Sequence, residues 1–143
     1  MCRSIETTRL VTRVVNGRAF EVLNPHYLEV GVLQVDGCLI NDHSRRVDWA
    51  IELPERKKLR HGVRSVKLIE LKGRDVLYAF TQMEATLIHP AVAEIRPFID
   101  EGFIVSQQSP ALLSAIQVAK SNFQDSFGLP IRVTAKAVID ASS

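Results

Sequence analysis

Three residues have the types and the spacing that metal-assisted chemistry needs. Glu70 and Lys72 stand two positions apart at the end of the apolar run 63–71, so the alternation of an extended strand points both side chains to one face. Asp48 lies in the preceding strand-like run, 47–53, and a hairpin between the two runs would bring it beside Glu70. Neighbouring carboxylates repel each other unless a cation compensates them. We expect that cation to be Mg²⁺, a hard ion that binds oxygen ligands.

The lysine indicates what such a site could do. Beside a bound metal, a lysine can orient or deprotonate an attacking water, or offset the charge that develops on phosphorus oxygens. The three residues therefore predict phosphodiester hydrolysis. Glu55 and Lys57 have the same spacing, but they lie in a polar run after Pro54 where no element would hold them. The alternative for Glu70 and Lys72 is an ion pair on an exposed edge strand, worth only ~0–1 kcal/mol.

Hydrophobic alternation predicts strands through the first half of the chain, over 9–15, 18–23, 27–35, 47–53 and 63–71. The first two form a hairpin at Asn16-Gly17, because this dipeptide supplies the positive φ angles of a two-residue turn. Asp36-Gly37 is typical of a turn and ends the third strand, and Pro54 ends the fourth. A polar loop over 55–62 joins the last two strands.

After Gly73 the hydrophobic period changes from 2 to about 3.6. Asp75 is the expected N-cap of a helix that ends before Pro90, with an apolar stripe at Val76, Phe80, Met83 and Leu87. A short helix over 91–100 and a buried strand over 102–106 follow. A second helix begins at Ser109-Pro110, carries the stripe Leu112, Ile116, Ala119, Phe123 and Phe127, and stops at Gly128. One strand over 131–137 ends the pattern, which predicts an α/β sandwich around a mixed sheet.

Length and composition fit a single globular domain over residues 1–143, with 46% hydrophobic and 24% charged residues. The longest apolar run, 76–80, is too short for a membrane span or a signal peptide. Cys2 and Cys38 cannot make a disulfide framework or a four-cysteine zinc site, which indicates a reducing, cytosol-like compartment. We therefore expect a cytoplasmic protein with no membrane contact.

Positive charge is concentrated in one stretch although the net charge is only +2. Residues 43–74 contain ten Lys and Arg against four acids, so a polyanion could dock there. The alternative is a solvated loop between two strands, because charge runs usually face water.

The wider pattern resembles the PD-(D/E)XK nuclease superfamily, which has the restriction-endonuclease-like fold. The matching residues are Val47-Asp48, then the predicted hairpin, then Ile69-Glu70-Leu71-Lys72-Gly73, and a following helix that carries Gln82. The resemblance spans about 28–138 and is closest to small single-domain bacterial members. It implies an α/β/α sandwich with a central mixed β-sheet, to which the N-terminal β-hairpin is an extension.

The resemblance also implies roles for individual residues. Asp48 and Glu70 would bind Mg²⁺ or Mn²⁺ with the main-chain carbonyl of Leu71, Lys72 would be the catalytic lysine, and Gln82 would contact water or the DNA backbone. The chain departs from the family at Val47, which replaces a proline without a chemical role, and at Thr86, which replaces a tyrosine found in some branches. A third acid would have to be Glu29 or Asp36.

The expected function is a divalent-metal-dependent nuclease that hydrolyses DNA, or RNA. The resemblance also allows a homodimer, because double-strand cutters of this fold commonly dimerise. The nucleic-acid-binding residues expected are Arg45, Arg46, Lys57, Lys58, Arg60 and Arg74. We expect the loop 55–62 to be mobile and to add affinity rather than catalysis. The alternatives are a catalytically inactive nucleic-acid- or protein-binding module on the same fold, and a small partner protein whose basic loop is incidental.

Several of these residues also have purely structural interpretations. Gln82 could be a solvated residue on its helix face, and His43 is expected to be a loop residue because no metal-binding histidine spacing is present. Trp49 and Phe80 are expected in the core rather than as base-stacking platforms.

Overall fold

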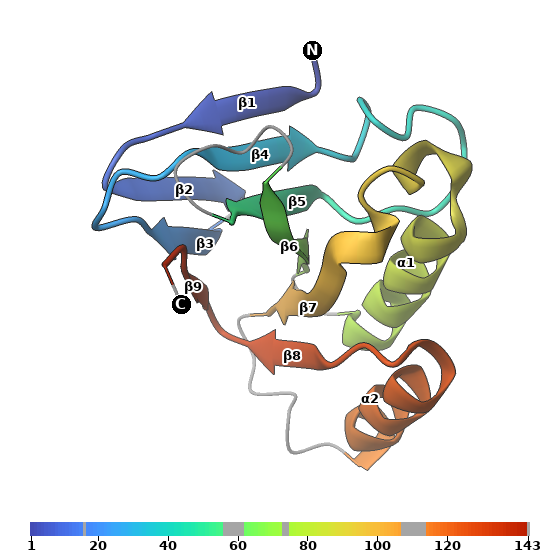
Figure 1. Cartoon of the computed structure of the whole chain (residues 1–143). Coiled ribbons are helices and arrows are strands. Elements are labelled where there is room, and N and C mark those ends of the chain that lie inside the picture. Colours follow the sequence, from blue (N-terminus) through green and yellow to red (C-terminus); the bar gives the residue numbers. More distant parts are fainter. Residues whose placement is uncertain (16, 56–61, 73–74, 107–113, 143) are drawn as a thin grey trace.

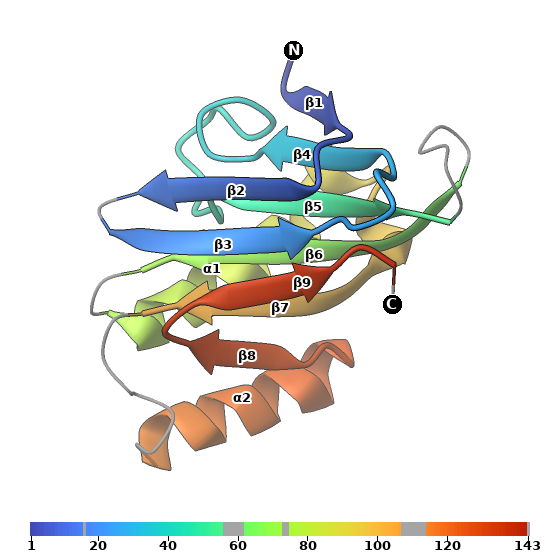
Figure 2. The same cartoon turned by 90° about the vertical axis from the view of Figure 1, so that its left-hand side faces the viewer.

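The chain forms three layers in the computed structural model, which describes residues 1–15, 17–55, 62–72, 75–106 and 114–142. A six-stranded mixed sheet lies in the middle, and a three-stranded sheet covers one of its faces (Figure 1 and Figure 2). Helices α1 (Val76–Ile88) and α2 (Ser114–Phe127) cover the other face. The mixed α/β class is confirmed. The α/β/α layering is wrong, because the N-terminal hairpin packs on the sheet face where a second helical layer was expected.

The central sheet has the strand order β1-β4-β5-β6-β7-β8. Its strands are β1 (Arg3–Glu6), β4 (Val30–Gln34), β5 (Trp49–Pro54), β6 (Val63–Leu71), β7 (Ile99–Val105) and β8 (Ile131–Thr134). Neighbours from β1 to β6 are antiparallel, whereas β6, β7 and β8 are parallel. The carboxyl ends of these three parallel strands therefore meet at the edge of the sheet where β5 begins.

The second sheet consists of β2 (Leu10–Val15), β3 (Arg18–Leu23) and β9 (Ala137–Asp140). The predicted hairpin is confirmed, with β2 and β3 antiparallel and a φ of 78° at Gly17. β9 pairs in parallel with β3. The single last strand predicted over 131–137 is wrong, because the chain bends at 135–136 and passes from the central sheet into the second one.

Helix α1 follows its predicted stripe, whereas α2 follows its stripe only in part, since Ile116 and Phe123 are buried but Phe127 is exposed. Asp75 caps α1 by accepting a hydrogen bond from the main-chain N–H of Tyr78 at 3.1 Å, and every predicted stripe residue of α1 is buried. Gly128 ends α2 with a φ of 64°, while the predicted start at 109–110 lies outside the described residues. The helix predicted over 91–100 is wrong. Two 3₁₀ turns, Pro90–Val92 and Arg96–Phe98, precede β7, and each begins with a proline in its first turn.

Two apolar cores lie on the two faces of the central sheet, and β6 contributes to both. Val66 and Leu68 belong to the core under the helices, whereas Ile69 and Leu71 belong to the core between the sheets. Because side chains alternate along a strand, Glu70 faces the helices.

Cys2 and Cys38 form a disulfide that ties the segment before β1 to the turn after β4. The expectation of two reduced cysteines is therefore wrong, and the pair counts against the cytoplasmic location, since disulfides persist mainly in oxidising compartments. The pairing depends on β1, a strand that the sequence did not predict. Among the described residues, no helix has the length and apolar character of a membrane span.

Candidate active site

Asp48 and Glu70 lie opposite each other at the helix-facing side of the central sheet. Trp49 on β5 is in register with Ile69 on β6, so the next residue outward on each strand is the opposed pair Asp48 and Glu70. The main-chain N–H of Asp48 donates to the Ile69 carbonyl at 3.2 Å. Its carboxylate accepts a hydrogen bond from the main-chain N–H of Leu71 at 2.8 Å. The end of β6 therefore holds the Asp48 side chain in place.

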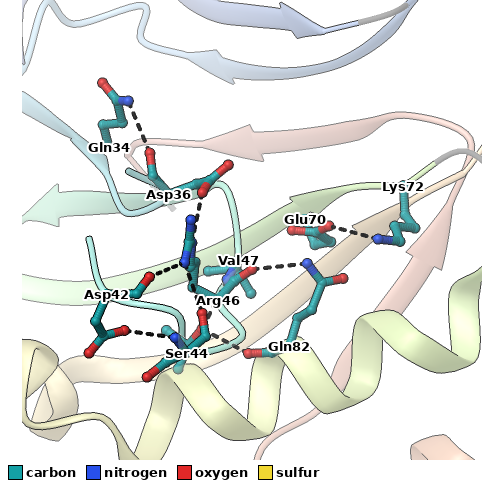
Figure 3. Close-up of polar contacts among 10 residues, drawn as sticks. Gln34, Asp36, Asp42, Ser44, Arg46, Val47, Glu70, Lys72 and Gln82 are labelled. Carbon is teal, nitrogen blue, oxygen red and sulfur yellow. Dashed lines mark hydrogen bonds and ion pairs between the residues drawn. The ribbon is translucent and has the colours of Figure 1, made fainter. Parts of the chain in front are cut away.

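Lys72 lies directly beside this pair. Its Nζ is 3.8 Å from Glu70 Oε2, and 24% of its side chain is exposed against 4% for Glu70 (Figure 3). The main-chain N–H of Lys72 donates to the Val105 carbonyl at 2.7 Å, which fixes the chain just after β6. Since β6 is an interior strand between β5 and β7, the alternative of an ion pair on an exposed edge strand is wrong.

Burial and mutual charge raise the pKa of both carboxyl groups. Burial raises the pKa of Glu70 to about 8, the negative charge of Asp48 adds to this rise, and the ammonium of Lys72 opposes it. Burial also raises the pKa of Asp48, against a lowering by the Leu71 hydrogen bond, and the charge of Asp36 raises it further. Two adjacent carboxyls with raised pKa values, one buried and one half-buried, are an arrangement that a nearby cation would stabilise in ionised form.

Two buried oxygen atoms at this place lack a hydrogen-bond partner among the described residues. They are Glu70 Oε1 and Gln82 Oε1. An unpaired buried polar atom costs about 1–3 kcal/mol, so such atoms are uncommon and often mark a missing ligand. Gln82 reaches from α1 toward the segment before β5, and its Nε2 donates to the Arg46 carbonyl at 3.0 Å (Figure 3). The alternative of a solvated Gln82 is therefore wrong.

One face of α1 holds the segment that leads into Asp48. Residues four apart on this face contact three consecutive residues of the segment: Tyr78 lies under the Arg45 guanidinium, Gln82 binds the Arg46 carbonyl, and Thr86 binds the Val47 N–H. Thr86 Oγ1 accepts from Val47 at 2.9 Å and donates to the Gln82 carbonyl at 2.8 Å. The sequence alone gives no role to Tyr78 or Thr86. Their four-residue spacing from Gln82 on one helix face was the available signal.

We expect Thr86→Val to destabilise the protein by about 1–3 kcal/mol, because the buried Val47 N–H would lose its acceptor. Urea unfolding of the parent and the variant measures this difference. Thr81→Val is the matched control, since its hydroxyl donates to a carbonyl of the same helix at an exposed position. The control should stay within about 0.5 kcal/mol of the parent. Equal losses in both variants would show that Thr86 does not hold this segment.

The expected nucleic-acid-binding arginines differ in their surroundings. Arg46 is engaged within the protein: its Nε lies 2.8 Å from Asp36 Oδ1, and its Nη1 donates to the carbonyls of Asp42 and Ser44. Arg45 is exposed. Lys57, Lys58, Arg60 and Arg74 lie outside the described residues. Arg46 therefore acts first as a structural residue of the 36–46 segment.

Of the two candidates for a third acid, only Asp36 lies near the site. Its main-chain N–H donates to the Asp48 carbonyl at 3.3 Å, although its carboxylate is paired with Arg46. Glu29 precedes β4 and so lies at the opposite end of that strand, about 20 Å away at ~3.3 Å per residue. The described part of the chain has no cluster of three His, Cys, Asp or Glu side chains suited to a metal.

The basic hairpin loop begins and ends far from Asp48. The main-chain N–H of Glu55 donates to the Gly62 carbonyl, and this closes the end of the β5–β6 hairpin that is opposite to the carboxylates. The six residues of β5 separate the two ends by about 20 Å. Among the described basic residues of this stretch, Arg45 and Arg46 precede the carboxylate end of the hairpin, whereas Arg64 lies near its other end. Residues 56–61 lie outside the described part of the chain.

Trp49, Phe80 and His43 fit their structural interpretations. Trp49 packs against the core between the sheets, Phe80 is buried under the helices, and His43 is exposed in a loop.

The resemblance to the PD-(D/E)XK superfamily concerns other residues, which are Asp48, Glu70, Lys72 and Gln82. Comparison of the chain with protein-family models, curated proteins and solved structures gives no match, so that resemblance stays a hypothesis.

Proposed function

We propose that the protein is a divalent-metal-dependent nuclease that hydrolyses phosphodiester bonds in DNA, with a site of the PD-(D/E)XK type. The observation that carries the proposal is the opposed pair of half-buried Asp48 and buried Glu70 on the helix-facing side of the sheet, with Lys72 beside it. A buried glutamate beside a second, half-buried carboxyl is costly in a protein without a ligand. Evolution retains such costly groups mainly where they have a function.

The donor atoms fit Mg²⁺ or Mn²⁺. Asp48 and Glu70 offer carboxylate oxygens, and the unpaired Oε1 atoms of Glu70 and Gln82 are oxygen donors without a partner in the described structure. The Leu71 main chain adds a carbonyl: its N–H points to Asp48, and the N–H and C=O of an extended residue project to the same side of a strand. Such an ion, when bound, would polarise a phosphoryl oxygen and lower the pKa of a coordinated water.

Three residues of the chain would bind and orient the phosphate, the attacking water and the metal. The Lys72 ammonium is partly exposed and would stabilise negative charge on the phosphate oxygens or orient the attacking water. Gln82, fixed through the Arg46 carbonyl, would orient the same water or a backbone oxygen of the substrate. Asp48 is held by the Leu71 N–H and so presents its other oxygen without rearrangement.

The test is a cleavage assay on single-stranded DNA, double-stranded DNA and RNA, with Mg²⁺, with Mn²⁺ and with EDTA. We expect metal-dependent cleavage of at least one DNA form and a higher Tm with Mg²⁺ than with EDTA. Asp48→Asn should lose both effects, because Glu70 alone holds a weakly binding ion poorly. Asp125→Asn, an exposed carboxylate on α2, is the control and should behave like the parent.

A parent protein with neither cleavage nor stabilisation by metal would contradict the nuclease proposal. Salt-sensitive DNA binding under those conditions would instead support the inactive binding module, since such binding depends on phosphate neutralisation.

A further inference from the structure

Two cations meet at one aromatic ring beside the carboxylates. Lys72 Nζ lies 4.8 Å from the centroid of the Tyr78 ring, and the Arg45 guanidinium carbon lies 5.3 Å from the same centroid. Both distances are within the ~6 Å at which a cation is attracted to a ring face. Tyr78 thereby links the lysine that follows β6 to the arginine of the segment before β5.

We propose that Tyr78 is a positioning residue that holds Lys72 and Arg45 as a cation pair, and that this pair binds neighbouring phosphates of one nucleic-acid strand. The inference rests on the proposed function, because it assigns Lys72 to the scissile phosphate. It adds the direction from which the strand reaches the carboxylates, which is across the N-terminal turn of α1.

The arginine of the pair is available to an anion. Arg45 is exposed and has no ion-pair partner among the described residues, in contrast to Arg46, which is paired with Asp36. An arginine fork binds phosphate oxygens in bidentate geometry. Since Arg45 contacts the protein through the Tyr78 ring, its donor groups stay available to a ligand.

The Tyr78 ring also reduces the cost of holding two cations beside the acidic residues of this site. A phosphate strand that approaches Asp48 and Glu70 meets two acidic residues, so cations are needed on its path. Two cations held close together repel each other, and both long side chains lose rotamer entropy when they are fixed. The ring offsets part of these costs for both side chains, and Glu70 Oε2, 3.8 Å from Lys72 Nζ, offsets more for the lysine.

Three variants separate the roles of the ring and of Arg45. Tyr78→Leu should lower kcat about fivefold because Lys72 loses its ring contact, and Tyr78→Phe, which keeps the ring, should rescue most of that loss. Arg45→Gln should raise KM several-fold with kcat within about twofold. In EDTA, with an uncleaved oligonucleotide, Arg45→Gln should also reduce the salt slope of binding by about one phosphate contact.

The matched control is Arg9→Gln, which removes the same charge from the segment before β2 in the second sheet and should change none of these values. Each variant is assayed at the same number of degrees below its own Tm. A Tyr78→Leu protein that cleaves as fast as Tyr78→Phe, or an Arg45→Gln protein with the parent's salt slope, would overturn the inference. If the parent does not cleave but Arg45→Gln and Tyr78→Leu both weaken binding, the nuclease proposal fails while the cation pair stands.

Discussion

Lys72→Ala should lower the rate of DNA cleavage by at least about 100-fold while the fold and the stabilisation by Mg²⁺ remain. The ammonium lies 3.8 Å from Glu70 and would act on the water or the phosphate oxygens, where its charge matters most in the transition state. Its removal also eases repulsion toward a bound cation, so metal affinity should not fall. Single-turnover cleavage and Tm values with and without Mg²⁺ measure the two effects separately.

Lys136→Ala is a suitable control for this variant. Lys136 also forms an ion pair with a glutamate, Glu21 at 3.0 Å, but on the second sheet. It should cleave DNA like the parent. If Lys72→Ala does so too, the assignment of the lysine to the reaction is wrong, whatever the metal dependence of the parent.

The second large effect concerns pH. In EDTA, the free energy of unfolding should fall by a few kcal/mol as the pH rises from about 4.5 to about 8. The pKa of Glu70 is about 8 in the folded protein against 4.5 as its ordinary value, so within this window the native state keeps a proton that the unfolded chain has released. That stability is fully present below the lower value and is lost as the pH passes the upper one. The raised pKa of Asp48 acts in the same direction.

Urea unfolding in EDTA at several pH values measures this dependence. Glu70→Gln should abolish most of it, because an amide stays neutral at every pH, and this variant should be more stable than the parent at alkaline pH. Glu84→Gln, at an exposed position of α1, should keep the parent's profile. Since a cation favours the ionised carboxyls, Mg²⁺ should stabilise the parent more at high pH than at low pH. An unchanged profile in Glu70→Gln would show that the pKa of this residue is ordinary.

Elements defined by local signals could be predicted from the sequence. The β2–β3 hairpin, the alternation over 63–71 and the Asp75 cap each involve residues close together in the chain, and each is present in the structure. The opposition of Asp48 and Glu70 also belongs to this group, because one antiparallel hairpin, β5–β6, sets it.

Features that depend on distant pairings could not be predicted. β1 is short and mostly exposed, and only its pairing with β4 makes it a strand and brings Cys2 near Cys38. The contacts of Tyr78 with Arg45 and Lys72 require α1 to pack beside two separate loops. Periodicity shows that a helix has a polar face, but it does not show which segment that face will contact.

The passage of the chain from β8 in the central sheet to β9 in the second sheet has a consequence for how the protein folds during synthesis. β9 is the third strand of the second sheet, and its inward residues Ala137 and Ile139 complete the core that also contains Phe20 and Val22 of β3. A ribosome adds about 5–20 residues per second, so several seconds separate the synthesis of β3 from that of β9. During that interval one edge of β3 lacks its partner and an apolar face is open to other chains. The second sheet is therefore complete only when β9 pairs with β3, and newly made chains are most prone to aggregate before that step.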